Sequence, residues 1–461
     1  MAPWRKYFAA LVASAWLSAC ASVHNTPVNE PAHGSVVDQL HLGFKEVADE
    51  DDMLIGLAFS GGGTRAAAFS FGVLSAFDDI PVPRAKDKLL DRLDFISGVS
   101  GGSVTAAYYG LKKRAALSDF RERFLLQNAE EGLQTTLSLA TMGRALGGGI
   151  NDQQGLTRWL DAHLFHGATY GQFRAVGPPR VWINASDIYN RVPFVFGATA
   201  FTAICSDLTK FPLSNAVAAS AAVPVAFAPI VVKAYPGTCT DPLPQWITRS
   251  AANRNASPML RSFASAILRY REGKVPYIKL LDGGLVDNYG LAGFTISRES
   301  SDTPYGPLTP QQAVRLRRSM FLVVDAKAGL SGNWVRTPEG PSGAELMQAV
   351  ADTAIDASVG ASYIAFERTM TDWRNALVRW RCGLSAADRK RYGAPAGWNC
   401  RDLKFFIGRV GFDQLEPARA AELGKVPTRF HLPQQQVDEV IAAGRDALRI
   451  NPAMRDFLKS L

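Results

Sequence analysis

Histidine is scarce in this sequence, Cys-x-x-Cys pairs are missing, and no segment repeats. Only six histidines occur in 461 residues, and the cysteine spacings match no zinc motif. The lack of repeats and of low-complexity segments indicates an ordinary globular fold. A formal net charge of +8 is spread along the chain, and no nucleic-acid-binding motif accompanies it. We therefore expect no metal, no cofactor and no nucleic acid as a partner.

A membrane-spanning segment is also missing at the N-terminus. Arg5 and Lys6 precede an apolar run from Tyr7 to Leu17, which is shorter than the ~20 residues that cross a bilayer as a helix. A basic start followed by a short apolar run is typical of a secretory signal peptide. We therefore expect an exported protein.

The end of this run, Leu17-Ser18-Ala19-Cys20, resembles a bacterial lipobox. The resemblance implies a lipoprotein signal peptide over residues 1–19 and a lipid anchor on Cys20 that attaches the protein to a membrane. Residue 21 is Ala, not the Asp of many inner-membrane lipoproteins. This implies the outer membrane of the bacterial cell envelope, with the protein facing the periplasm or the surface. Ordinary secretory cleavage near Ala19 or Ala21 is the alternative.

Four cysteines remain if Cys20 carries lipid. They are Cys205, Cys239, Cys382 and Cys400. An even number in an exported chain predicts disulfides, and three pairings are possible. Sequence proximity favours Cys205–Cys239 and Cys382–Cys400, while buried free thiols are the alternative.

Apolar runs alternate with helical patterns along residues 51–330. The runs Met53–Phe59, Val181–Ala185, Tyr277–Leu281 and Met320–Asp325 are largely apolar, as strands covered on both faces are. Helical segments lie between them, which is the pattern of an α/β protein. We expect a three-layer α/β/α fold with a mainly parallel central sheet.

The remaining segments differ from this pattern. Residues 20–50 are rich in Pro, Gly and acidic side chains and predict a tether. Residues 235–276 contain prolines and one helical stretch, which predicts an insertion, either a flap near the site or a surface elaboration. Residues 331–461 predict a helical and mixed extension that packs on the same core.

The segment Gly98-Val99-Ser100-Gly101-Gly102 carries the first chemical signal. A Gly-x-Ser-x-Gly sequence between a strand and a helix forms a sharp turn that exposes the serine hydroxyl at the helix N-terminus. Gly98 and Gly102 are needed because the strand and the helix approach closely there. Ser100 is therefore the candidate nucleophile.

A second glycine-rich turn, Ser60-Gly61-Gly62-Gly63-Thr64-Arg65, also leads from a strand into a helix. Free backbone N–H groups in such a turn bind anions, and in an acyl hydrolase they would form the oxyanion hole. No Lys-Ser or Lys-Thr follows, so the loop is not a P-loop. A dinucleotide fingerprint would need glycine where Ala66 stands. We expect no nucleotide, and a plain tight turn is the alternative.

The third signal is Asp282-Gly283-Gly284, which follows the strand Tyr277–Leu281. An aspartate at a strand end followed by two glycines can approach another loop closely. Asp282 could then accept the Ser100 proton.

Together these three motifs resemble the patatin-like phospholipase family. Ala218–Pro224 and Asn184–Asp187 are similar to further family segments, and the resemblance spans roughly Leu54 to Asn288. It implies a lipid substrate and hydrolysis of carboxyl esters, as in a phospholipase A, a lysophospholipase or an esterase. Ala66, where the family often has Gly, is a departure that leaves the loop glycines intact.

The resemblance also implies roles for individual residues. Ser100 would attack the ester carbonyl, with Asp282 as its base in a catalytic dyad. Gly61, Gly62 and Gly63 would donate to the oxyanion. Arg65 would lie near this oxyanion hole, where it could favour the oxyanion or an anionic headgroup.

Three alternatives stay open at this point. His431, the only histidine after Asp282, could complete a Ser–Asp–His triad, although we expect it to be a surface or cap residue. The same acyl-enzyme could transfer its acyl group to another alcohol. A non-catalytic envelope lipoprotein on the same scaffold is the alternative from another class.

Overall fold

The computed structural model describes residues 25–36, 52–83, 86–131, 133, 148–329, 333–336 and 338–461. The predicted signal peptide 1–19, Cys20 and much of the predicted tether lie outside these ranges. Within them, no helix combines the length and the apolar character that a membrane crossing requires.

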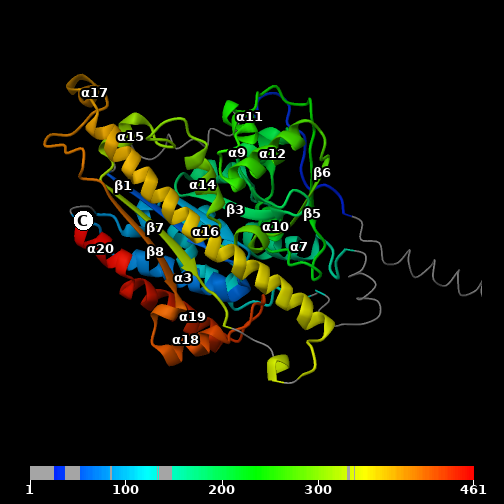
Figure 1. Ribbon diagram of the computed structural model, residues 1–461. Coiled ribbons are helices and arrows are strands. Elements are labelled where there is room, and N and C mark those ends of the chain that lie inside the picture. Colours follow the sequence, from blue (N-terminus) through cyan, green and yellow to red (C-terminus); the bar gives the residue numbers. More distant parts are fainter. Residues whose placement is uncertain are drawn as a thin grey trace, which may run out of the picture.

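In the described residues, eight strands form one sheet, and the predicted α/β architecture is confirmed (Figure 1). Five neighbouring strands are parallel: β8 (Lys404–Gly411), β7 (Arg318–Asp325), β1 (Met53–Phe59), β2 (Phe95–Val99) and β3 (Arg180–Asp187). Three are antiparallel to their neighbours: β4 (Val192–Val195) and β6 (Tyr277–Asp282) on β3, and β5 (Ile230–Lys233) on β6. The sheet is thus mixed but mostly parallel.

Side chains of β1 alternate between two hydrophobic cores, one on each face of the sheet. Ile55 and Leu57 lie in the core that includes α3 (Gly63–Asp79), α4 (Gly101–Lys112) and α19 (Gln434–Ile450). Leu54 and Ala58 lie in the core that includes α14 (Ala292–Glu299) and α16 (Gly343–Cys382). Figure 1 shows the long α16 lying across its face of the sheet. Covering of both faces explains why β1 is apolar throughout.

Shorter helices complete the layers and the ends of the sheet. They are α5 (Ala116–Phe120), α7 (Gly155–Leu160), α8 (Tyr170–Val176), α9 (Ala198–Ala203), α10 (Leu213–Ser220), α11 (Gln245–Ala252), α12 (Pro258–Arg271), α13 (Gly284–Asp287), α15 (Pro310–Arg315), α17 (Ala386–Arg391), α18 (Pro417–Gly424) and α20 (Pro452–Ser460). The segment 235–276 contains α11 and α12.

Residues 25–36 form an N-terminal arm, and its first part lies along the edge strand β5. Val28 N–H donates to the Val231 carbonyl at 3.0 Å. The Asn29 side chain accepts from Lys233 N–H at 2.7 Å and donates to the Lys233 carbonyl at 2.9 Å. Residues 25–36 of the predicted tether therefore belong to the folded body, and part of this arm binds backbone groups of the edge strand β5.

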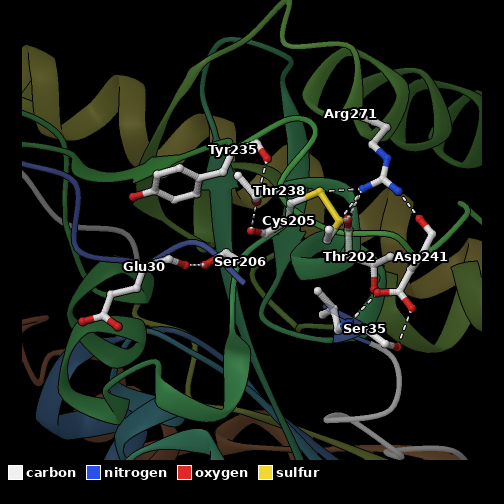
Figure 2. The surroundings of a disulfide bond; sticks show 11 residues. Glu30, Ser35, Thr202, Cys205, Ser206, Tyr235, Thr238, Asp241 and Arg271 are labelled. Atoms are coloured by element: carbon white, nitrogen blue, oxygen red, sulfur yellow. Dashed lines mark hydrogen bonds between the residues drawn. A yellow bond between two sulfur atoms is a disulfide. The ribbon is translucent and has the colours of Figure 1, made fainter. Parts of the chain in front are cut away.

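Two disulfides lie outside the sheet. Cys382–Cys400 joins the end of α16 to the segment before β8, and Cys205–Cys239 joins the end of α9 to the segment before α11. Figure 2 shows the second bond with Arg271 beside it, and the Arg271 Nη1 lies 2.6 and 2.7 Å from its two sulfurs.

The far end of the N-terminal arm is bound next to this disulfide. Ser35 Oγ donates to the Asp241 carboxylate at 2.6 Å, and Val36 N–H donates to its other oxygen at 2.5 Å (Figure 2). Arg271 in turn donates to the Asp241 carbonyl. The disulfide, Arg271 and Asp241 thus fix the end of the arm against the body.

Candidate active site

The glycine loop and the Ser100 turn meet at the carboxyl edge of two neighbouring parallel strands. In the β1–β2 register, Phe59 lies opposite Gly98. The loops that follow the two strands therefore begin side by side at this edge of the sheet. A Cβ added to Gly102 would lie 2.5 Å from the Ser60 carbonyl oxygen. The two loops are therefore in contact, and glycine is required at that contact.

Strands β2 and β6 lie end to end along one edge of β3. Asn184 of β3 pairs with Val99 of β2 and with Val195 of β4, so β2 and β4 occupy opposite edges. Ala185 pairs with β4 and with Asp282 of β6, which places β6 on the edge that β2 occupies. The C-terminal ends of β2 and β6 thus face each other at adjacent positions of β3. This arrangement brings the two ends of the predicted dyad together.

Ser100 occupies a backbone conformation that side chains rarely adopt. Its φ is 50° and its ψ is −124° at the N-terminus of α4, and its side chain is buried. Its N–H donates to Ser220 Oγ at 2.8 Å, and Ser220 Oγ donates to the Asn184 carbonyl at 2.6 Å. A strained serine at a strand-to-helix turn is typical of a nucleophile held for reaction.

Asp282 lies buried beside this serine and has a perturbed pKa. Burial raises the pKa of the Asp282 carboxyl to about 6, while hydrogen bonds from Gly284 N–H and from the Ser100 side chain partly oppose the increase. The Gly284 nitrogen lies 2.8 Å from Asp282 Oδ1. A carboxylate with a pKa near the working pH, bonded to a serine hydroxyl, can act as a general base.

The glycine loop differs from its prediction at one residue. Gly61 N–H donates to the main-chain oxygen of Asn288 at 3.1 Å and to its Oδ1 at 3.2 Å, so it is not a free oxyanion donor. Gly62 and Gly63 have φ values of 138° and 59°, and their N–H groups donate to no acceptor in the described part of the chain. The predicted three backbone donors are thereby reduced to two.

The Arg65 side chain is bonded to three protein groups. Its Nε donates to the Ala326 carbonyl at 2.9 Å, its Nη1 to the Val426 carbonyl, and its Nη2 to Thr428 Oγ1 at 2.9 Å. Burial lowers the pKa of the guanidinium to about 10, which leaves it charged at neutral pH. All three nitrogens are thus bonded to protein groups. Arg65 thus connects the start of α3 to the C-terminal segment, and its Nη2 lies beside the glycine loop, 3.0 Å from the position of a Cβ on Gly62.

The other predicted residues take supporting positions or lie apart. Gly283 lies against the strand β3, where an added Cβ would be 2.3 Å from the Asn184 carbonyl oxygen. A Cβ added to Gly98 would lie 2.8 Å from the Gly102 carbonyl oxygen, and one added to Gly284 would lie 3.0 Å from Asp282 Oδ1. His431 is exposed in the segment before α19, whereas Ser100 and Asp282 are buried.

The sequence analysis missed two residues at the site, Ser220 and Asn288. Ser220 lies in Ala218–Pro224, a segment for which the sequence shows only a family resemblance. Asn288 lies six residues after Asp282 at the end of the short α13. In both cases a polar side chain close to a motif was the available signal, and its partner could not be read from the sequence.

A separate cavity of about 320 Å³ lies away from these residues. It is lined by the start of β3, the end of β4, and side chains of the helices α9, α11, α12 and α14, among them Trp182, Trp246 and Phe263. Neither Ser100, Asp282 nor the glycine loop lines it. The described residues also contain no group of three His, Cys, Asp or Glu side chains that could hold a metal ion.

A family model described as Patatin-like phospholipase matches residues 57–295, slightly more than half of the chain. No curated protein sequence matches. Similar solved structures include human GIVD cytosolic phospholipase A2, with 13% identity and a TM-score of 0.45, covering 92% of this chain and 66% of that one. VipD from Legionella pneumophila has 14% identity and a TM-score of 0.27, covering 86% of this chain and 67% of that one. The chain thus spans about two thirds of the length of these proteins.

Proposed function

The chain belongs to the patatin-like phospholipase family, and we propose that it is a serine acyl hydrolase that cleaves carboxyl esters of lipids. One observation carries the proposal. A serine in a strained turn, Ser100, shares a hydrogen bond with the buried Asp282, whose pKa is raised to about 6. If the hydrogen bond between Ser100 and Asp282 only neutralised a buried charge or capped the helix, Ser100 would not need this strained backbone conformation.

The proposed reaction has two steps. Ser100 Oγ forms a bond to the ester carbonyl carbon while Asp282 takes the hydroxyl proton, and the carbonyl oxygen becomes an oxyanion. When this intermediate collapses, the bond to the lipid alcohol breaks and Asp282 returns the proton to the leaving oxygen. Water then attacks the acyl-serine ester by the same route and releases the fatty acid.

The N–H groups of Gly62 and Gly63 would stabilise the oxyanion in both steps. They belong to the first residues of α3 and its N-cap, where amides have no partner within the helix. Removing one donor of this kind typically slows the reaction by about 10²- to 10³-fold. The helix N-terminus adds a favourable dipole.

We also propose that Cys20 carries a lipid anchor, so that the enzyme acts at a membrane of the bacterial envelope. Asn25, the first described residue of the N-terminal arm, donates to the Pro229 carbonyl at 3.2 Å. Pro229 ends a loop that includes Ala222, whose carbonyl accepts from Asp282 N–H at 2.8 Å. Five residues of chain reach at most about 18 Å, so the anchor would lie within that distance of Asn25.

This location can be tested in cells of a Gram-negative host. Wild-type protein should label with radioactive palmitate and sediment with the outer membrane, whereas Cys20→Ala should do neither. Palmitate labelling that persists in Cys20→Ala would contradict the proposal.

The proposed activity is tested by product analysis with defined phospholipids, lysophospholipids and triglycerides. Wild-type protein should release fatty acid and react with a fluorophosphonate probe, and Ser100→Ala should do neither. Ser118→Ala is a matched control because Ser118 is exposed. Folded wild-type protein that neither reacts nor turns over would favour a non-catalytic scaffold. A new ester formed from an added alcohol would instead indicate acyl transfer.

A further inference from the structure

The cavity that lies apart from the candidate site is far larger than a packing defect. Protein interiors contain few voids larger than a water molecule, whereas this cavity has a volume of about 320 Å³, within the range of sites that bind small molecules. We propose that it binds the single acyl chain of an amphiphile, either a fatty acid or a lysophospholipid. The inference goes beyond the proposed function and does not depend on it, because neither Ser100 nor Asp282 lines the cavity.

Apolar side chains form most of the cavity wall. Six aromatic residues line it, and they come from five parts of the chain: Tyr170 and Phe173 of α8, Trp182 of β3, Phe196 after β4, Trp246 of α11 and Phe263 of α12. Of the described residues that line the cavity, Arg180 alone carries a charge. A wall of aromatic and aliphatic side chains with few polar groups is typical of a site for an apolar ligand.

The size of the cavity and its few polar groups indicate which apolar ligand fits. A methylene group fills roughly the volume of a water molecule, about 30 Å³, so the cavity accommodates a chain of about ten carbons and not the two chains of a phospholipid. Thr199, Ser297 and Ser300 also line it and are half-buried. Their hydroxyl groups, together with Arg180, can bind the polar end of an amphiphile. A single chain with one polar end therefore matches both the volume and the wall.

Packing within the protein holds these walls apart. The helix α12 contacts α9, α11 and α14, and Figure 1 shows these four helices grouped beside β3. The Trp246 and Phe263 rings stack with their centroids 6.5 Å apart, and the Trp182 ring lies 4.7 Å from that of Phe294. The segment 235–276, predicted as an insertion, thus lines the cavity through α11 and α12. A cavity fixed by packed rings exists before the ligand arrives, which lowers the cost of binding.

Calorimetric titration with saturated fatty acids of six to sixteen carbons, below their micelle concentrations, tests the inference. The Ser100→Ala variant is used, so that lysophospholipids titrated in parallel stay intact. We expect one bound molecule per protein and an affinity that rises about fourfold with each methylene until about ten to twelve carbons, and then levels off. The head group that binds more tightly at equal chain length identifies the source of the chain. An affinity that continues to rise through sixteen carbons would indicate adsorption to exposed apolar surface and overturn the inference.

Variants that fill the cavity separate ligand binding from a structural role. Ser297 lies on the face of α14 that borders the cavity, since Gly293 and Ser300 also line it at helical spacing. Ser297→Phe and Ala198→Phe should each weaken the binding of dodecanoate about 10²-fold, because a ring takes the place of several methylenes. The melting temperature should not fall, and hydrolysis of a soluble short-chain ester should not change. Ala420→Phe, at a half-buried position of α18 that does not line the cavity, is the matched control. Unchanged dodecanoate binding in both folded variants would overturn the inference.

Tryptophan fluorescence locates the bound chain. An undecanoate that carries bromine at its terminal carbon quenches the indole rings that it contacts, and Trp182 and Trp246 line the cavity. Trp182→Phe and Trp246→Phe should each remove part of the quenching, while the affinity stays within about threefold of wild type. Prior reaction of Ser100 with a small fluorophosphonate should leave binding unchanged.

The outcomes of these measurements distinguish the inference from the proposed function. Quenching that is the same in both tryptophan variants, or a chain displaced by the reaction at Ser100, would overturn the inference and leave the proposed hydrolysis standing. Protein that binds the chain in the cavity but shows no Ser100-dependent hydrolysis would overturn the proposed function alone.

Discussion

The span that matches the family, residues 57–295, and the C-terminal third of the chain contribute differently to the candidate site. Ser100, Asp282 and the loop glycines all lie in the first region. The second supplies groups that hold them, since Thr64 N–H donates to the Arg429 carbonyl at 2.9 Å and Arg65 donates to Val426 and Thr428. Motif residues and their supports are thus separated by more than three hundred positions. Residues 57–295 alone therefore do not contain all the groups that hold the candidate site in place.

Asp282→Asn should have the largest effect and tests the first region alone. Loss of the base should lower kcat by about 10⁴-fold, while the removal of a buried carboxylate should leave the fold intact or raise its melting temperature at pH 8. Steady-state kinetics and thermal unfolding measure the two. Asp456→Asn, at an exposed position, is the control. If Asp282→Asn kept a tenth of the wild-type activity, Asp282 would not be the base of the dyad.

The pH profile sharpens the same assignment. Because the pKa of Asp282 is raised from 3.8 to about 6, kcat/KM should fall about tenfold per pH unit below 6 and level off above it. Stability should change in the opposite direction: the raised pKa favours the protonated folded state, and this contribution is lost as the pH rises through 6. An acid limb near pH 4 would show that another group is the base.

Arg65→Ala tests the connection between the two regions. Three hydrogen bonds from a buried cation would be lost, and the Ala326 and Val426 carbonyls would lose their donor. We expect the free energy of unfolding to fall by about 3 kcal/mol and kcat/KM to fall about tenfold as the glycine loop loosens. Urea unfolding and kinetics measure this, with the exposed Arg158→Ala as control. Lost activity at unchanged stability would instead indicate a direct contact with substrate.

His431→Ala should change kcat/KM least of these variants. It tests whether the C-terminal third contributes a residue to the chemistry. The side chain is exposed, whereas the dyad is buried, so kcat/KM should stay within about twofold of wild type. The same lipid assay measures it. A loss of activity as large as that of Ser100→Ala would show that the catalytic group is a triad. The C-terminal third would then supply a catalytic residue and not only groups that hold the site.

The parts that could be predicted from the sequence are those fixed by local chemistry. The strand Met53–Phe59 and the turns at Gly61–Gly63 and Ser100 follow from short apolar runs and adjacent glycines, and the family resemblance joined them to Asp282. The partner of Gly61 N–H could not be predicted, because Asn288 lies 227 positions away. The acceptors of Arg65 could not be predicted for the same reason, since they lie 261 to 363 positions away.

The docked N-terminal arm was missed on different grounds. Its prolines and polar residues are typical of a linker. Its backbone partners lie on the short strand β5, which the sequence analysis did not identify, and in the segment after α9, where the Cys205 carbonyl accepts from Ala32 N–H at 2.8 Å. Composition alone does not distinguish a free linker from one that an exposed sheet edge binds.

The end-to-end placement of β2 and β6 on one edge of β3 has a consequence for variation within this fold. The distance between nucleophile and base depends on two adjacent residues, Asn184 and Ala185, and not on the 182 positions that separate Ser100 from Asp282 in sequence. Loops between these strands can lengthen or shorten without moving the reacting atoms. A slip of β3 by a single residue would shift its neighbours by about 3.3 Å. We therefore expect related chains to differ in length over residues 235–276, and to tolerate no insertion within β3 or within α10, whose Ser220 accepts from Ser100 N–H.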